Sequence, residues 1–238
     1  MLFTRRFFLA ALALTSAGVL SACGYRGETV RYRLTVDVDT PQGLRSGSSV
    51  LEARIRQSGK NSLLTPEARG VRTDLKGEAV TVEMPDGRLL FALLRRPGGY
   101  AGQIVGLFNY VTPLPKFEGE YASVRRVEYL KEHGGAGVVP PERYPMLVTF
   151  DDINDPTSIR EVDPGDLAAS FGEGVSLRSI RVAITDDEVT TGIEKHLKWL
   201  PNTHGRLKPL PLDEHPEEGP LPLWARTNDG DFSRGLSD

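Results

Sequence analysis

Apolar and polar residues alternate along residues 29–38, a pattern that predicts a strand with one face on the core and the other in water. The apolar members of this pattern are Val30, Tyr32, Leu34, Val36 and Val38. A second alternation covers residues 51–56. We therefore expect residues 29–56 to form a β-hairpin whose strands are joined by a long connection rich in serine and glycine.

The chain between residues 71 and 94 predicts three further strands, at 71–75, 79–84 and 88–94. Their separators, Lys76-Gly77 and Pro85-Asp86-Gly87, have the composition of tight turns. The run 89–94 is apolar on both faces, so it should be a central strand that is covered on both sides.

Two segments that follow could supply this cover. Residues 100–111 are mostly apolar and fit either a helix or a strand. Residues 121–130 carry apolar side chains every three positions, which favours an amphipathic helix ending near Gly134, with a strand as the alternative.

The C-terminal half predicts a mixture of strands and short helices. Residues 134–137 resemble a flexible glycine connector, and residues 146–150 and 175–185 predict strands. Thr191 and Glu194 have the spacing of a capping box, which predicts a short helix. The end of the chain is rich in proline and has no sustained period, so we expect it to lie extended and partly docked.

Together these elements predict a β-rich, α+β fold. The architecture expected is an antiparallel, sandwich-like sheet with two or three short helices and an extended, proline-rich C-terminal tail. We assign residues 29–200 to a single domain and residues 201–238 to the tail.

The N-terminus has the organisation of a signal peptide, which we assign to residues 1–22. Arg5 and Arg6 form a cationic head, and the uncharged run 7–19 would rise about 20 Å as a helix, less than the ~30 Å of a bilayer core. The sequence Leu20-Ser21-Ala22-Cys23 then resembles the lipobox of bacterial lipoproteins. An ordinary secretory signal with a chance cysteine is the alternative.

The lipobox resemblance implies that a diacylglycerol is attached to the Cys23 thiol, that the chain is cut before Cys23, and that residues 23–28 are a lipidated tether. Gly24 follows the cysteine, and the absence of an aspartate at this position resembles lipoproteins that are passed on to the outer membrane, where the protein would face the periplasm. Residues 4–10 (TRRFFLA) also resemble a twin-arginine export motif carried by Arg5 and Arg6, although the general secretion route uses similar basic heads.

Composition limits the classes of function. Cleavage before Cys23 leaves 216 residues and removes two positive charges, so that the formal net charge of −3 becomes −5. A mildly acidic chain without a basic block argues against nucleic acid as a partner. Cys23 is the only cysteine, so disulfides within the chain are excluded.

An acidic stretch between residues 151 and 166 is the most chemically suggestive part of the chain. Its carboxylates could bind calcium, and the candidate ligands are Asp151, Asp152, Asp155 and Asp163. The alternative, which the spacing favours, is that these residues form Asx turns and a helix N-cap.

Two runs of the mature chain, YRLTVDVDTPQGLRSGSSV and FDDINDPTSIREVDPGDLAASFG, resemble proteobacterial predicted lipoproteins of unassigned activity. No catalytic motif is evident, and we predict no catalytic residue and no cofactor. We expect a membrane-anchored lipoprotein with a non-enzymatic structural, adaptor or binding role, with an envelope protein as a candidate partner. The alternative is an α+β enzyme or a small-ligand or calcium-binding protein with its site near Asp151 to Asp166.

Overall fold

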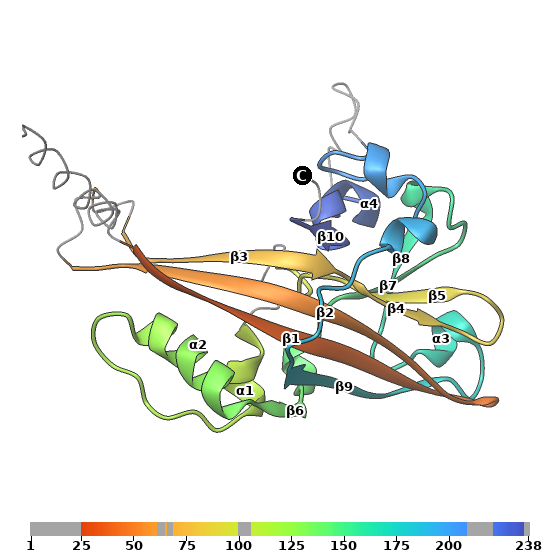
Figure 1. Cartoon of the computed structure of the whole chain (residues 1–238). Helices are drawn as coiled ribbons and strands as arrows, with labels where there is room; N and C mark the ends of the chain where they lie inside the picture. The colour runs from red at the N-terminus through yellow and green to blue at the C-terminus, as the bar shows by residue number, and fades with distance from the viewer. Residues whose placement is uncertain (1–24, 61–64, 66–68, 100–105, 209–220, 236–238) are drawn as a thin grey trace, which may run out of the picture.

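The computed structural model describes residues 25–60, 65, 69–99, 106–208 and 221–235, which form two antiparallel sheets (Figure 1). The first sheet has the order β10-β3-β2-β1-β9-β6, and the second has the order β4-β5-β7-β8. The strands are β1 (Tyr25–Thr40), β2 (Gly43–Ser58), β3 (Val71–Glu78), β4 (Val80–Glu83), β5 (Leu89–Ala92), β6 (Ala136–Val138), β7 (Leu147–Phe150), β8 (Ile159–Val162), β9 (Ser176–Ile184) and β10 (Ser233–Arg234). The predicted β-rich, antiparallel fold is confirmed.

The described residues also contain four short α-helices, one more than the largest number predicted. They are α1 (Phe108–Val111), α2 (Ala122–His133), α3 (Ala168–Phe171) and α4 (Leu223–Arg226). The amphipathic segment is the helix α2, whose buried residues are Val124, Val127 and Leu130 and which ends at Gly134 with a φ of 71°. None of the helices in the described part of the chain is long and apolar enough to cross a membrane.

The central hairpin is longer and more tightly closed than predicted. β1 and β2 pair from Tyr25↔Ser58 to Thr40↔Gly43, so the connection has only two residues. The serines and glycines of residues 43–49 are paired with β1 in this hairpin and do not form a loop. Small residues suit this part of β2, because β4 packs closely over it. A Cβ on Gly47 would lie 2.0 Å from the Thr81 carbonyl oxygen. The predicted tether is likewise shorter, since residues 25–28 already belong to β1.

The three strands expected between residues 71 and 94 are present as β3, β4 and β5. The turn predicted at Lys76-Gly77 is not, because β3 continues through Gly77 to Glu78 and the chain then crosses into the second sheet. Gly77 has a φ of 134°, and a Cβ there would meet Leu51 at 2.5 Å. The glycine therefore permits a close approach of two strands inside a sheet.

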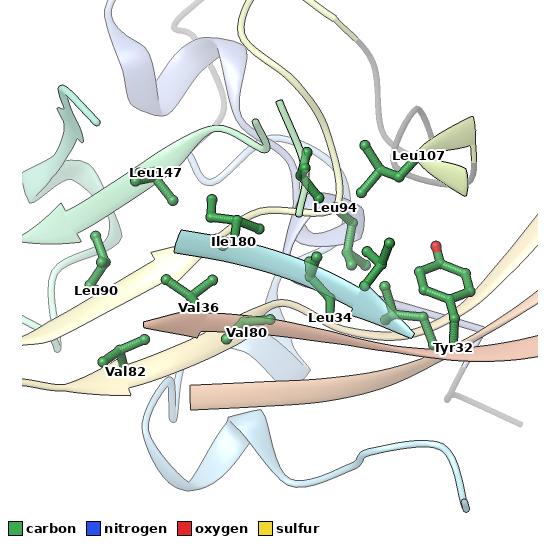
Figure 2. Packing of buried hydrophobic residues seen from close by; sticks show 14 of the residues in the cluster. Tyr32, Leu34, Val36, Val80, Val82, Leu90, Leu94, Leu107, Leu147 and Ile180 are labelled. Carbon is green, nitrogen blue, oxygen red and sulfur yellow. The ribbon is translucent and has the colours of Figure 1, made fainter. Parts of the chain in front are cut away.

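The β5 strand and the residues after it are covered on both faces, as predicted. Leu90, Ala92 and Leu94 enter the core between the two sheets, where Leu90 lies near Val36 and other residues of the first sheet (Figure 2). The alternate residues Phe91 and Leu93 enter a second cluster. That second cluster is completed by residues of the C-terminal part of the chain, whereas Leu107, Phe108, Val127 and Leu130, from the two segments expected as cover, pack in the first cluster with Leu90 and Leu94.

The helices α1 and α2 instead cover the first sheet. They lie beneath the half of the β1–β2 hairpin where the chain enters β1, while the second sheet covers the other half (Figure 1). The inward residues of β1 therefore meet two partners, helices at Tyr32 and strands at Val36.

The described parts of the C-terminal segment, residues 201–208 and 221–235, are docked on the rest of the fold, as predicted for part of this segment. β10 pairs with the edge of β3, and Phe232 is completely buried. Residues beyond the domain boundary expected at residue 200 contribute to the second cluster and to one sheet edge. Residues 209–220 lie outside the described part of the chain.

Two local predictions in the C-terminal half are also corrected. The glycine connector at 134–137 contains the edge strand β6, which pairs with β9. The helix expected after Thr191 is only a 3-10 turn (Ile193–Lys195) that lacks a side-chain cap from Thr191. Its first backbone N–H groups, at Gly192 and Ile193, donate to the buried Glu78 carboxylate at 3.0 and 2.9 Å. A carboxylate from β3 thus replaces the local cap.

Candidate ligand-binding cleft

A cleft of about 580 Å³ lies between the first sheet and the helices α1 and α2. Its volume is within the range of small-molecule sites, about 300–1,000 Å³. Its lining includes Tyr32, Phe108, Val127, Arg96, Arg126, Arg143 and Arg234.

The floor of the cleft is apolar because inward-facing positions of three elements meet there. Val30 and Tyr32 are two residues apart on β1, so both point to the same face of the sheet. Val127 comes from the apolar stripe of α2, and Phe108 begins α1. The rings of Tyr32 and Phe108 meet edge to face, with centroids 5.4 Å apart.

Four half-buried arginines complete the lining of the cleft: Arg96, Arg126, Arg143 and Arg234. The Nη1 group of Arg126 donates to the Asn109 side-chain oxygen at 3.1 Å. The guanidinium of Arg143 lies 3.8 Å from the centre of the Tyr110 ring. Its Nε atom is buried and has no hydrogen-bond partner among the described residues.

The four cleft arginines are distinguished by lining one cleft together. Among the described residues, none of the four lies within ion-pair distance of a carboxylate. Nine others do form such pairs: Arg26, Arg31, Arg33, Arg56, Arg88, Arg95, Arg160, Arg178 and Arg181. Six further arginines of the described chain also form no ion pair, namely Arg45, Arg54, Arg72, Arg125, Arg206 and Arg226. A net-acidic protein thus gathers four arginines without ion pairs at one cleft with an apolar floor, although Arg234 is close enough to Asp231 to interact with it electrostatically.

The Tyr32 hydroxyl is a further unsatisfied group in this cleft. The side chain is 1% exposed, and its hydroxyl has no hydrogen-bond partner among the described residues. Burial raises the pKa of Tyr32 far above its usual value, so the hydroxyl stays protonated. It can therefore donate a hydrogen bond to a ligand atom.

This arrangement suits binding of an anion that carries an apolar group. Guanidinium groups form paired hydrogen bonds with carboxylates and phosphates, and the apolar floor would hold the rest of the ligand. The cleft's lining, as far as the structure describes it, contains no histidine, cysteine or carboxylate that could act as a general base.

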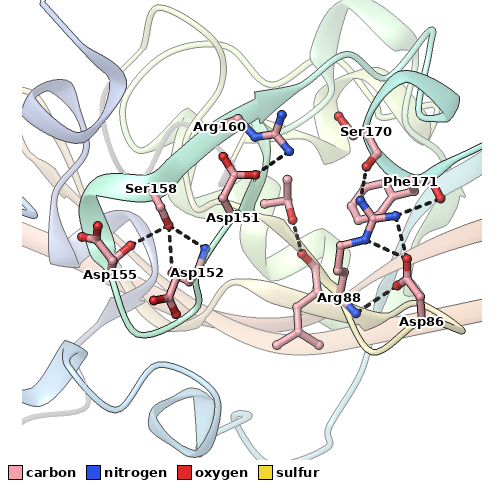
Figure 3. A network of polar contacts seen from close by, with 11 residues as sticks. Asp86, Arg88, Asp151, Asp152, Asp155, Ser158, Arg160, Ser170 and Phe171 are labelled. Atoms are coloured by element: carbon pink, nitrogen blue, oxygen red, sulfur yellow. Dashed lines mark hydrogen bonds and ion pairs between the residues drawn. The ribbon is translucent and has the colours of Figure 1, made fainter.

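The acidic stretch uses its side chains in local turns, as the spacing favoured (Figure 3). Asp152 accepts the backbone N–H of Asn154 at 2.9 Å, and Asp155 accepts that of Thr157 at 2.8 Å. Asp151 pairs with Arg160 at 2.7 Å.

Beyond these residues, Asp163 accepts the backbone N–H of Gly165 at 2.7 Å, and Asp166 caps the N–H of Ala169 at 3.1 Å. Within the described residues, no three carboxylate, histidine or cysteine side chains are grouped so that they could hold a metal ion. The predicted Asx turns and cap are therefore confirmed, and the calcium alternative gains no support from this geometry.

The remaining predicted site residues, Cys23, Arg5 and Arg6, lie outside the described residues, so lipidation and twin-arginine export stay predictions. Sequence reasoning missed the cleft, because its four arginines come from four separate parts of the chain between residues 96 and 234. Comparison of the chain with family models, curated proteins and solved structures found no match.

Proposed function

We propose that the protein is a lipid-anchored envelope protein, exposed to the periplasm, that binds an anionic ligand with an apolar part in the arginine-lined cleft. The lipobox resemblance at Cys23 supports the anchor. The cleft favours ligand binding among the structural, adaptor and binding roles that the sequence left open.

The observation that carries this proposal is the unneutralised charge of the cleft. A partly desolvated guanidinium is costly unless an anion accompanies it. Arg96, Arg126, Arg143 and Arg234 line one cleft, and none of them has a carboxylate within ion-pair distance among the described residues. The simplest function for such a cluster is to receive an anion from outside the chain.

The ligand's apolar part is inferred from the floor of the cleft. Tyr32, Phe108 and Val127 are almost completely buried, yet each contributes to the lining. The apolar surface that is open to water at the cleft comes from Val71 and Tyr110, each 50% exposed, and an alkyl or aromatic group would cover it whereas an inorganic anion would not. We therefore expect an amphipathic anion to bind more tightly than inorganic phosphate.

Calorimetric titration of the mature chain carrying Cys23→Ser would test this binding role. Dodecyl phosphate, below its micellar concentration, should bind at least about tenfold more tightly than dodecyl maltoside or dodecyltrimethylammonium. Arg126→Gln should weaken dodecyl phosphate binding by about tenfold or more, since a charged hydrogen bond contributes about 1.5–3 kcal/mol. Arg160→Gln is the matched control, because Arg160 pairs with Asp151 outside the cleft. Equal affinity for the three detergents would refute the proposal.

The anchor needs a separate test. Cys23→Ser in the full-length precursor should remove the protein from the membrane fraction, because the acyl chains provide the attachment. Retention of this variant in the membrane fraction after a high-salt wash would contradict lipid anchoring, while leaving the ligand-binding proposal intact.

A further inference from the structure

We infer, building on the proposed function, that the cleft takes an anionic lipid of the same membrane that anchors the protein. The headgroup would lie against the arginines and an acyl chain on the apolar floor. Three observations carry this inference: the position of the cleft in the sheet, the exposed apolar residues beside it, and the buried donor within it.

The cleft lies in the half of the sheet that is nearest to the anchor. It is lined by Val30 of β1 and by Val71, the first residue of β3. Val71 pairs with Gln57, whose neighbour Ser58 pairs with Tyr25 at the start of β1. The lining therefore reaches to within one residue step of the end where the chain enters the sheet.

The distance from the lipidated cysteine to the cleft is short. Gly24 is the only residue between Cys23 and Tyr25, so this connection spans at most about 7 Å. Val30 lies five residue steps beyond Tyr25 along β1, at ~3.3 Å per step. The cleft therefore begins no more than about 24 Å from the modified sulfur, which keeps it near the lipid headgroups.

Apolar residues are exposed beside the cleft. Four large hydrophobic residues are exposed in the described structure, and two of them, Val71 and Tyr110, also line the cleft. Each is 50% exposed. An acyl chain leaving a bilayer would meet these side chains before it reaches Phe108 and Val127, whereas a fully polar ligand would gain nothing from them.

The polar groups of the cleft match a lipid headgroup with a single charged phosphate. Arg126 and Arg143 can donate to the phosphate oxygens, and the protonated Tyr32 hydroxyl can donate to a phosphate or ester oxygen deeper in the cleft. Anchoring raises the local concentration of such headgroups, so that modest intrinsic affinity suffices.

Photo-cross-linking of the full lipidated protein in vesicles would test the source of the ligand. Phosphatidylcholine vesicles would contain about a fifth of a phosphatidylglycerol analogue whose acyl chain carries a diazirine, or the same analogue of phosphatidylcholine. Cross-links should form in α1 and α2 with the anionic analogue, and at least fivefold less with the zwitterionic one.

Substitutions in the cleft supply the second part of the test. Arg126→Gln and, as an independent conservative change, Arg143→Lys should each lower the cross-link yield several-fold, whereas Arg160→Gln should leave it unchanged. Circular dichroism of each variant would show that it is folded. The inference is overturned if cross-links fall only on residues next to Cys23, or if both cleft variants retain the wild-type yield.

The soluble ligands separate this inference from the proposed function. Arginine-dependent binding of dodecyl phosphate without cross-linking of phosphatidylglycerol would mean that the cleft takes a free anion, which overturns the lipid source alone. Failure of both ligands would overturn the lipid source and the proposed binding role together.

Discussion

The Nε atom of Arg95 lies 3.2 Å from the Oδ2 atom of Asp231, and the two side chains are only 8% and 1% exposed. This buried pair joins the end of β5 to the C-terminal segment. Arg95 also donates to the Thr227 hydroxyl at 3.1 Å. The next residue after Arg95 is Arg96, and Arg234 follows Asp231 by three residues, so the pair fixes the backbone that positions two of the four cleft arginines.

Removing one member of this pair should destabilise the protein strongly. Asp231→Ala would leave the Arg95 guanidinium buried without its carboxylate, at an expected cost of about 3–5 kcal/mol in the free energy of unfolding. Urea denaturation would measure it. Asp151→Ala is the control, because Asp151 pairs with Arg160 at the surface and should cost less than about 1 kcal/mol. Similar losses for both variants would show that the buried pair has no special role.

The buried Glu78 should make stability depend on pH in an unusual direction. Burial raises the pKa of Glu78 above 4.5, although hydrogen bonds from the Gly192 and Ile193 N–H groups oppose that rise. A raised pKa means that folding favours the protonated form. The contribution of Glu78 is therefore complete below pH 4.5 and is lost as the pH rises through the folded-state pKa.

The measurement compares wild type with Glu78→Gln in urea from about pH 4 to pH 8. The stability of wild type relative to this variant should fall as the pH rises. Asp37→Asn is the opposite case: burial would raise the pKa of Asp37, but hydrogen bonds from Ser46, Arg181 and Ser179 lower it below 3.8. The greater stability of wild type relative to Asp37→Asn should therefore be lost as the pH falls. Parallel slopes for the two variants would contradict this assignment.

The alternation of residues 29–38 predicted β1 because each inward position really is buried. Residues 89–94 were likewise predictable, since alternate side chains enter two different clusters. The serines and glycines of β2 misled the prediction because turn residues and closely packed strand residues have the same composition. Position 47 requires a glycine because β4 lies against it, and no local sequence pattern reveals this close packing.

The cleft could not be predicted for a different physical reason. The sequence shows how many arginines the chain contains, but pairing depends on the fold. Arg95 and Arg96 are neighbours, yet only Arg95 pairs with a carboxylate in the described structure. Its partner Asp231 lies 136 residues further along the chain, so the local sequence does not reveal the pair. An excess of charge at one site is therefore visible only after every ion pair has been placed.

Phe232 tests whether the C-terminal segment belongs to the domain. Its ring is completely buried and lies 5.8–5.9 Å from the rings of Phe91, Phe150 and Trp199. Phe232→Ala should lower the free energy of unfolding by about 3–5 kcal/mol, which thermal melting would register as a markedly lower midpoint. Tyr110→Ala, at a half-exposed ring, is the control and should have a much smaller effect. An unchanged midpoint for Phe232→Ala would restore the picture of a loosely docked tail.

Tyr32→Phe should separate a ligand-binding role from a structural one. The Tyr32 hydroxyl is buried without a partner among the described residues, a situation that costs about 1–3 kcal/mol in a folded protein. Removing the hydroxyl should therefore leave the unliganded protein as stable as wild type, or more stable. The same change should weaken dodecyl phosphate binding by about five- to tenfold, because the ligand loses a hydrogen bond. Urea denaturation and calorimetric titration on one preparation would measure both effects. A large loss of stability would indicate that the hydroxyl supports the fold, and unchanged affinity would exclude it from the ligand's contacts.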